Sequence, residues 1–155
     1  MYQINKILVP IDFSDYSKNA LKFAIDIAEK FQSKLFLVYV IEPMIYPTDF
    51  SIGQIAIPAV ENDLTLRAEE ELKNLVNQEI SKRVEAEAII KSGKPFIEII
   101  ETASEIDADL IIIATHGHTG VEHLLFGSTA EKVVRKAPCP VLTLREPLKG
   151  FKFTS

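Results

Sequence analysis

The stretch from Ala114 to Val133, ATHGHTGVEHLLFGSTAEKV, gathers glycine, histidine and hydroxyl side chains between an apolar run and an amphipathic run. Within it, Gly117 is followed by nine residues and then by Gly127 and Ser128. Glycines let a backbone approach a ligand closely, and the first amides of a helix attract phosphate without the help of a lysine. This spacing therefore indicates phosphate binding at the start of a helix.

The same residues have an interpretation that needs no ligand. The string STAE is typical of a capping box, in which Ser128 accepts a hydrogen bond from the amide of Glu131. A hydroxyl accepts one hydrogen bond and donates another, so Ser128 can cap the helix and also bind phosphate. Thr129 supplies a second hydroxyl donor.

The chain has three histidines, His116, His118 and His123, all in this stretch, which raises the question of a metal site. Zinc needs closely converging His, Cys or carboxylate ligands, and Glu122 is the one acidic residue nearby. We therefore expect the histidines to supply loop polarity or a phosphate contact, and no metal site built from side chains. The single cysteine, Cys139, stands between two prolines, and we expect it to serve in packing.

Apolar runs rich in β-branched residues predict strands, and amphipathic runs between them predict helices. Continuous apolar character fits strands that are buried on both faces, in an α/β fold with helices on both sides of a parallel sheet. Ser14 is the expected N-cap of the first helix, and Pro95 suits the first turn of the third. The predicted strands are Ile4–Asp12, Lys34–Glu42, Val84–Lys91, Asp109–Thr115 and Cys139–Glu146, and the predicted helices are Asp15–Phe31, Glu61–Lys82, Pro95–Ile106 and Thr129–Lys136.

The 155 residues fit one domain over positions 1–155, with 146–155 as a C-terminal tail. A net charge of −5 argues against a broad surface for nucleic acid or anionic membrane. No apolar run approaches the ~20 residues of a membrane helix, and the first residues lack the features of a signal peptide. With its single cysteine, the chain is expected to be cytoplasmic, with neither nucleic acid nor membrane as a partner.

Three common phosphate-binding or phosphorylation motifs are excluded. The chain has no G-x-x-x-x-G-K-[ST] string, and the first strand ends in VPIDFSD, without the glycines of a dinucleotide fingerprint. A receiver domain of the response-regulator type has a phosphorylatable aspartate after the third strand. This chain has Lys91, Ser92 and Gly93 there.

The pattern that remains, A-x-x-G-x9-G-S, closely resembles the nucleotide-binding signature G-x-x-G-x9-G-[ST] of the universal stress protein family. KILVPIDFSDYSKNALKFAIDIA, LFLVYVIEP and DADLIIIATHGHTGVEHLLFGSTAEKVVRKAPCPVLTLR resemble the opening, second strand and closing half of that family. The resemblance implies a five-stranded parallel sheet of order 3-2-1-4-5, Rossmann-like and of the adenine nucleotide alpha hydrolase type. Ala114 replaces the first glycine of the signature, a departure that bears on affinity if that position requires positive φ.

In that strand order, a crevice opens where the first and fourth strands end, because their connections leave in opposite directions. Asp12 and Thr115 both border it. Asp12 either accepts hydrogen bonds from ribose or base, or only forms the turn before the first helix. Val40 either contacts adenine or is plain core. The nucleotide-binding residues that the resemblance implies are Pro10, Ile11, Asp12, Val40, Ala114, His116, Gly117, His118, Gly120, Gly127, Ser128 and Thr129.

The resemblance implies a stress-response regulator that binds ATP, ADP or AMP, with Mg²⁺ accompanying the triphosphate. No residue stands out as a general base, so we expect slow ATP hydrolysis at most. One alternative is an adenylating or nucleotide-hydrolysing enzyme on the same fold, although PIDFSDYS is not the Ser/Gly-rich loop of such enzymes. The other is a dimeric interaction module that has lost nucleotide binding, with Ala114 as its only support.

The last strand, Pro140 to Arg145, lies at a sheet edge in the implied order. An apolar edge strand exposes unpaired backbone groups, which antiparallel pairing with a second copy would satisfy. Family members often associate in this way. The edge and the resemblance together predict a homodimer.

Overall fold

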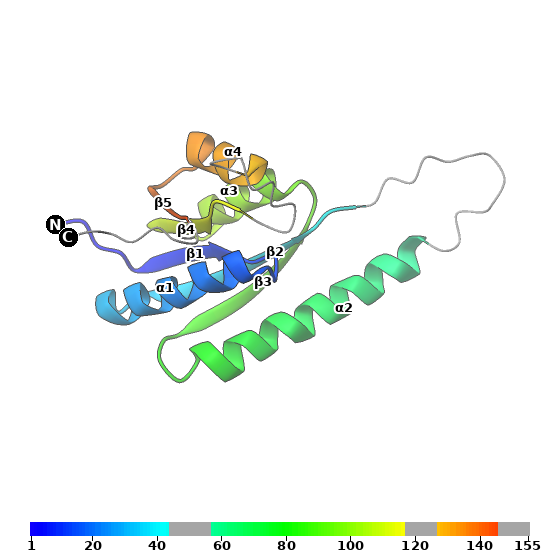
Figure 1. Ribbon diagram of the computed structural model, residues 1–155, viewed down its shortest axis with the longest axis horizontal. Coiled ribbons are helices and arrows are strands. Elements are labelled where there is room, and N and C mark those ends of the chain that lie inside the picture. Colours follow the sequence, from blue (N-terminus) through cyan, green and yellow to red (C-terminus); the bar gives the residue numbers. More distant parts are fainter. Residues whose placement is uncertain (44–56, 117–126, 146–155) are drawn as a thin grey trace, which may run out of the picture.

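The computed structural model describes residues 1–43, 57–116 and 127–145 (Figure 1). Five parallel strands form one sheet in the order β3-β2-β1-β4-β5, which confirms the predicted fold class and strand order. The elements are β1 (Lys6–Pro10), α1 (Asp15–Phe31), β2 (Lys34–Ile41), α2 (Ile57–Leu75), the π-helical turn η1 (Val76–Ile80), β3 (Ala86–Ser92), α3 (Pro95–Glu105), β4 (Leu110–Ala114), α4 (Ser128–Lys136) and β5 (Val141–Leu144).

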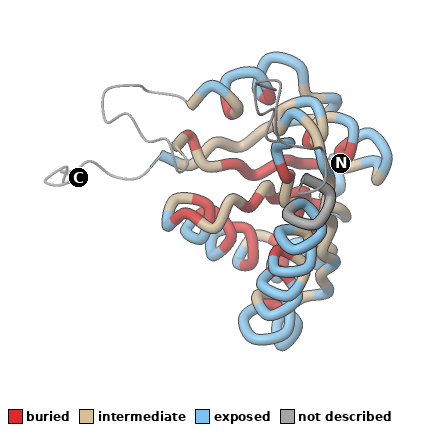
Figure 2. The backbone as a smooth tube through the Cα atoms, turned by 90° about the vertical axis from the view of Figure 1, so that its right-hand side faces the viewer, coloured by how far each residue is buried: buried red, intermediate tan, exposed pale blue. Residues whose placement is uncertain are grey.

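Both faces of the sheet are covered, because side chains alternate along its central strands. In β1, Ile7 and Val9 join a core with α1 and α2, whereas Leu8 joins a second core with α3 and α4. All three side chains are fully buried. Figure 2 shows the result, with buried positions through the middle of the molecule and exposed ones on the outer sides of the helices.

The first predicted helix is confirmed at both ends. Ser14 is its N-cap, with extended backbone and a side chain that accepts a hydrogen bond from the amide of Ser17 at 3.2 Å. Gln32 ends the helix in the left-handed conformation. A well-capped helix directly after β1 holds the connecting turn in one place.

Most of the other predicted boundaries are wrong by one or two residues, and two of the errors have a clear local reason. The second helix begins at Ile57, four positions before the predicted Glu61, because Pro58 is compatible with a first helical turn and extends it upstream of the amphipathic stripe. The first strand ends at Pro10 and not at Asp12, because the backbone of Asp12 has already turned toward α1. No helix in residues 1–43, 57–116 and 127–145 is long and apolar enough to cross a membrane.

Candidate functional site

Asp12 lies where the chain leaves β1 and turns into α1. Its backbone N–H donates to Oγ of Ser17 at 3.3 Å, and its Oδ1 accepts from the backbone N–H of Ser14 at 3.0 Å and from the Ser14 hydroxyl at 2.5 Å. Asp12 therefore does form the turn, as one of its two interpretations predicted. A carboxylate has about four acceptor positions on two oxygens, so this role and ligand binding are compatible.

Phe13, the next residue, has a backbone conformation that few side chains adopt. Its φ is 61°, in the left-handed region, which costs a non-glycine residue roughly 1–2 kcal/mol. Its ring packs against Tyr39 of β2 with centroids 5.0 Å apart. Burial raises the pKa of Tyr39, and the negative charges of Glu71 and Asp12 raise it further. The packed pair holds the turn in a strained geometry, a feature that often accompanies functional sites.

The carboxyl end of β4 forms the other side of the site. Ala114 is the last residue of the strand, opposite Leu144 of β5, and its φ is not positive. Alanine at this signature position therefore carries no left-handed penalty. Thr115, which is buried, donates from both its N–H (3.0 Å) and its Oγ1 (3.3 Å) to the carbonyl of Leu144.

Thr115 also anchors the start of α4. The N–H of Gly127 donates to the carbonyl of Thr115 at 2.5 Å, and a Cβ added at Gly127 would lie 3.1 Å from the same oxygen. The φ of Gly127 is −67°, so glycine is favoured here by close approach and not by backbone conformation. The contact joins the end of β4 directly to the first turn of α4.

The predicted capping box is wrong. Gly127 is the N-cap of α4, Ser128 is the first helical residue, and no side chain of the described residues caps the helix. The amide of Glu131 bonds to the carbonyl of Gly127 at 3.1 Å and not to Ser128. The amides of the first helical turn, at Ser128, Thr129 and Ala130, consequently have no acceptor within α4, and they carry the partial positive charge of the helix start.

His116 connects the two sides. Its Nδ1 lies 3.0 Å from Oγ1 of Thr115, and its ring lies 5.5 Å, centroid to centroid, from the ring of Tyr16 in α1. Within the described ranges, no three His, Cys, Asp or Glu side chains come together as a metal site would require. His118, Gly117 and Gly120 of the predicted site, together with His123, Glu122 and the tail 146–155, lie outside the described residues.

Strands β1 and β4 are neighbours in which Leu8 pairs with Ile111. Counting on along both strands brings Asp12 level with Thr115, so residues about a hundred positions apart lie at the same carboxyl edge of the sheet, where the crevice is predicted. Ile11 is buried, and its N–H donates to Val38 at 2.8 Å, while Val40 lies half-buried at the margin of the α3–α4 core. Acceptors at the end of β1 and amide donors at the start of α4 thus lie at the same edge of the sheet.

The comparison with known families agrees with this geometry. The profile described as "Universal stress protein family" matches residues 3–145. The chain belongs to the universal stress protein family.

Relatives and solved structures of the family match over most of their length. A universal stress protein of Methanocaldococcus jannaschii is 34% identical over 150 residues, which cover 93% of this chain and 84% of that protein. Another, of Bacillus subtilis, is 32% identical, covering 91% of this chain and 99% of the relative. The structure of a universal stress protein from Lactobacillus plantarum superposes with a TM-score of 0.77 at 28% identity, covering 92% of this chain and 99% of that one.

Two further structures were solved with nucleotides. One is a universal stress protein in complex with cAMP (TM-score 0.60, covering 94% of this chain and 99% of that one), and the other is an Archaeoglobus fulgidus universal stress protein in complex with dAMP (TM-score 0.63, covering 92% and 98%). Each is 23% identical to this universal stress protein, a level at which the likeness shows the fold alone.

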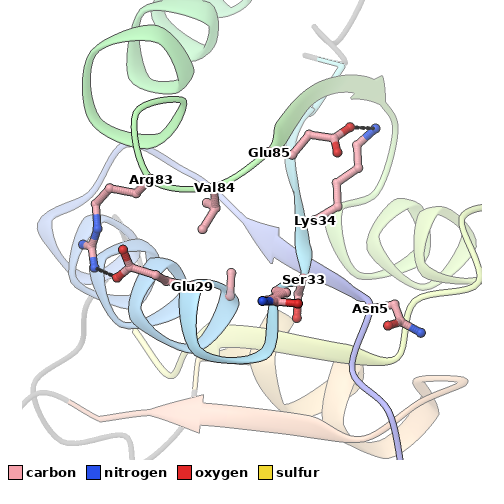
Figure 3. Close-up of a pocket in the computed structure, with 9 residues that line it drawn as sticks. Asn5, Glu29, Ser33, Lys34, Arg83, Val84 and Glu85 are labelled. Atoms are coloured by element: carbon pink, nitrogen blue, oxygen red, sulfur yellow. Dashed lines mark hydrogen bonds and ion pairs between the residues drawn. The ribbon is translucent and has the colours of Figure 1, made fainter.

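A second concavity lies at the opposite, amino-terminal end of the sheet (Figure 3). Its volume is about 340 Å³, and four of its nine lining residues are charged. Arg83 forms ion pairs with Glu29 and with Asp26, the latter at 2.9 Å. Lys34 forms ion pairs with Glu85 at 3.1 Å and with Glu87 at 3.0 Å. The charges of this concavity are thus directed at one another.

The sequence places Thr115 at the border of the predicted crevice but assigns it no contact, and it gives no role to Phe13. In the structure, Thr115 supplies the carbonyl that holds Gly127, and Phe13 holds the turn after Asp12. Phe13 carries no comparable signal, because phenylalanine is not among the residue types that favour a left-handed backbone.

Proposed function

We propose that this universal stress protein binds an adenine nucleotide, ATP foremost, across the carboxyl ends of β1 and β4 and acts as a stress-response regulator. The observation that carries the proposal is the start of α4, where the N-cap is a glycine and the first-turn amides receive no side-chain cap from the part of the chain that the structure describes. Amides in that position favour anions. The nucleotide complexes of the two distant structures agree with this choice of ligand.

Different residues would contact the phosphates, the ribose and the base of the nucleotide. Amides and hydroxyls of Ser128 and Thr129 would hold the phosphates, with Gly117, His118 and Gly120 completing the loop. Asp12 would accept hydrogen bonds from ribose or base, and Val40 would provide an apolar contact for adenine. When bound, Mg²⁺ would neutralise triphosphate charge, with its remaining ligands from water.

The geometry supports binding more than rapid hydrolysis. Asp12, the carboxylate of the crevice, is hydrogen-bonded to both the amide and the hydroxyl of Ser14, which suits an acceptor held in place. We therefore propose a regulator with slow ATPase activity at most. The interaction module without nucleotide loses its support, because Ala114 has no positive φ to strain it.

A purified sample tests the proposal directly. Protein expressed in cells should release adenine nucleotide when it is denatured and deproteinised, detectable by absorbance and chromatography. Calorimetric titration of nucleotide-free protein with ATP should then give saturable one-to-one binding. A sample that carries no nucleotide and gives no heat with ATP, ADP or AMP would contradict the proposal.

We also propose that two copies pair through β5. This strand is at the edge of the sheet and contacts β4 on one side, with all four of its residues half-buried. The carbonyls of Pro140 and Leu144 point toward β4, where they accept from Ile111 and Thr115. Since backbone groups alternate in direction along a strand, those of Thr143 face outward, where a second copy would pair.

Thr143→Pro should therefore shift the protein toward monomer in size exclusion coupled to light scattering, because it removes an outward donor. Thr143→Val is the matched control, since it keeps the donor and should remain dimeric. Leu142→Pro is a poorer test, because its donor faces β4 inside the sheet. A wild-type chain that is monomeric at tens of micromolar would contradict the dimer.

A further inference from the structure

Three lysines converge on one aromatic ring where α3 and α4 pack side by side (Figure 1). The ammonium groups of Lys94, Lys132 and Lys136 lie 5.5, 5.0 and 5.7 Å from the centroid of the Phe96 ring. Because all three ammonium groups lie within 5.7 Å of the same ring centroid, any two of them are separated by at most twice that distance. This is close to the screening length of about 10 Å at 0.1 M salt, so the three charges repel one another.

This cluster is unusual for a chain of net charge −5. Every ion pair within the described part of the chain involves some other cation: Lys34, Arg67, Arg83, Lys91 or Arg135. Neither Glu98 nor Glu131, the nearest acidic residues along these helices, forms an ion pair with the cluster. Glu131 pairs with Arg135 at 3.0 Å, and the carboxylate of Glu98 is folded over Gly93. The Phe96 ring offsets part of the repulsion, by roughly 0.5–1 kcal/mol for each cation at an exposed site.

The start of α3 adds to the positive potential. Lys94 is the N-cap of α3 and makes no side-chain capping bond, and Pro95 follows it as the first helical residue. The partial positive charge of this helix end therefore lies next to the three ammonium groups. Together these features concentrate positive charge around one ring, and no ion pair within residues 1–43, 57–116 and 127–145 neutralises it.

We propose that Lys94, Lys132 and Lys136 around Phe96 form a second anion-binding site, separate from the crevice between β1 and β4, that takes a short phosphate chain. Lysine ammonium groups are compact point charges suited to phosphate. An oligophosphate concentrates several charges within the span of the cluster. An acidic peptide carries one charge per residue and must be ordered in order to bind, so the geometry favours the phosphate chain.

Inorganic tripolyphosphate is the probe, titrated into the full-length protein by calorimetry with saturating AMP present to occupy the crevice. Each single substitution, Lys94→Gln, Lys132→Gln or Lys136→Gln, should weaken binding roughly threefold, and the triple variant at least tenfold. The matched control is the triple variant Lys18→Gln, Lys22→Gln, Lys30→Gln, which changes three exposed lysines of α1 and the net charge equally. It should bind like the wild type, and so should Gly127→Val. In NMR spectra, the Phe96 ring signals should shift as tripolyphosphate is added.

Four outcomes would overturn the proposal. Both lysine triple variants could lose affinity equally, which would mean that only net charge matters. Gly127→Val could abolish tripolyphosphate binding while the Lys94 triple variant retains it, which would assign the ion to the crevice. A hexaglutamate peptide could bind the cluster more tightly than tripolyphosphate, which would make it a protein-docking surface. The wild type could fail to bind at all. None of these results depends on whether ATP binds the crevice.

Discussion

The two ends of the sheet use polar groups in opposite ways. At the amino-terminal end, Arg83 and Lys34 each contact two carboxylates, and the concavity between them is lined by charges that are already paired. At the carboxyl end, α4 begins at Gly127 with no side-chain cap from the described residues. Uncapped donors lower stability unless a ligand uses them. The comparison teaches that the charges of the amino end are satisfied within the protein, whereas the amides at the start of α4 are the donors that the proposed nucleotide would use.

Gly127→Val should have the largest effect on the carboxyl end. The branched side chain meets the carbonyl of Thr115, 3.1 Å from the added Cβ, and pushes the first turn of α4 away from the crevice. ATP binding should weaken by more than about 1.4 kcal/mol, or tenfold, with AMP less affected because it has fewer phosphates. Calorimetry with both nucleotides measures this. Because the contact is within the protein, the unfolding midpoint must be recorded as well, and Gly127→Ala should lie between the two.

If Gly127→Val binds ATP as tightly as the wild type while folded, the start of α4 is not the phosphate site. The two ends of the sheet would then differ in stability alone.

Asp12→Ala tests the opposite side of the crevice. If Asp12 holds ribose or base, ATP and AMP should weaken by a similar amount, about 1 kcal/mol, because they share those groups. Asp12→Asn is the control, since its Oδ1 still accepts from Ser14 and keeps the turn while the charge is lost. Parallel titrations of both variants separate the two roles. Unchanged affinity in Asp12→Ala would leave the residue as a turn former only.

Arg83→Gln tests the amino-terminal end. Glu29 and Asp26 both raise the pKa of Arg83 above its ordinary value, as expected for a paired guanidinium. These charges are exposed, so the unfolding midpoint should fall by no more than about 3 °C, and the loss should shrink as salt is raised. ATP affinity should stay within twofold of the wild type. A loss of ATP binding in this variant would contradict the inference that the ion pairs at the amino-terminal end of the sheet are independent of the nucleotide site.

The sequence predicts most of the fold because its signals are local. Apolar runs, Ser14 and Pro95 each act over a few residues, and the strand order came from the family resemblance. What the sequence could not provide arises between distant segments. The approach of Gly127 to Thr115 and the pairing of Phe13 with Tyr39 depend on how β4, α4 and the β1–α1 turn meet. The same holds for the lysines around Phe96, which come from two helices.

Ser128→Ala should have the smallest effect, and it is informative for that reason. A serine that capped α4 would lose about 1 kcal/mol of stability on replacement by alanine. Ser128 is instead exposed and lies inside the first turn, one position after the N-cap, so stability should change by less than ~0.5 kcal/mol. If its hydroxyl binds phosphate, ATP should weaken by up to about threefold, near 0.6 kcal/mol, while AMP changes less. Thermal unfolding and paired titrations distinguish these results. A large loss of stability with unchanged affinity would mean that Ser128 caps the helix after all, and the amides at the start of α4 would then be less available to a ligand than the structure indicates.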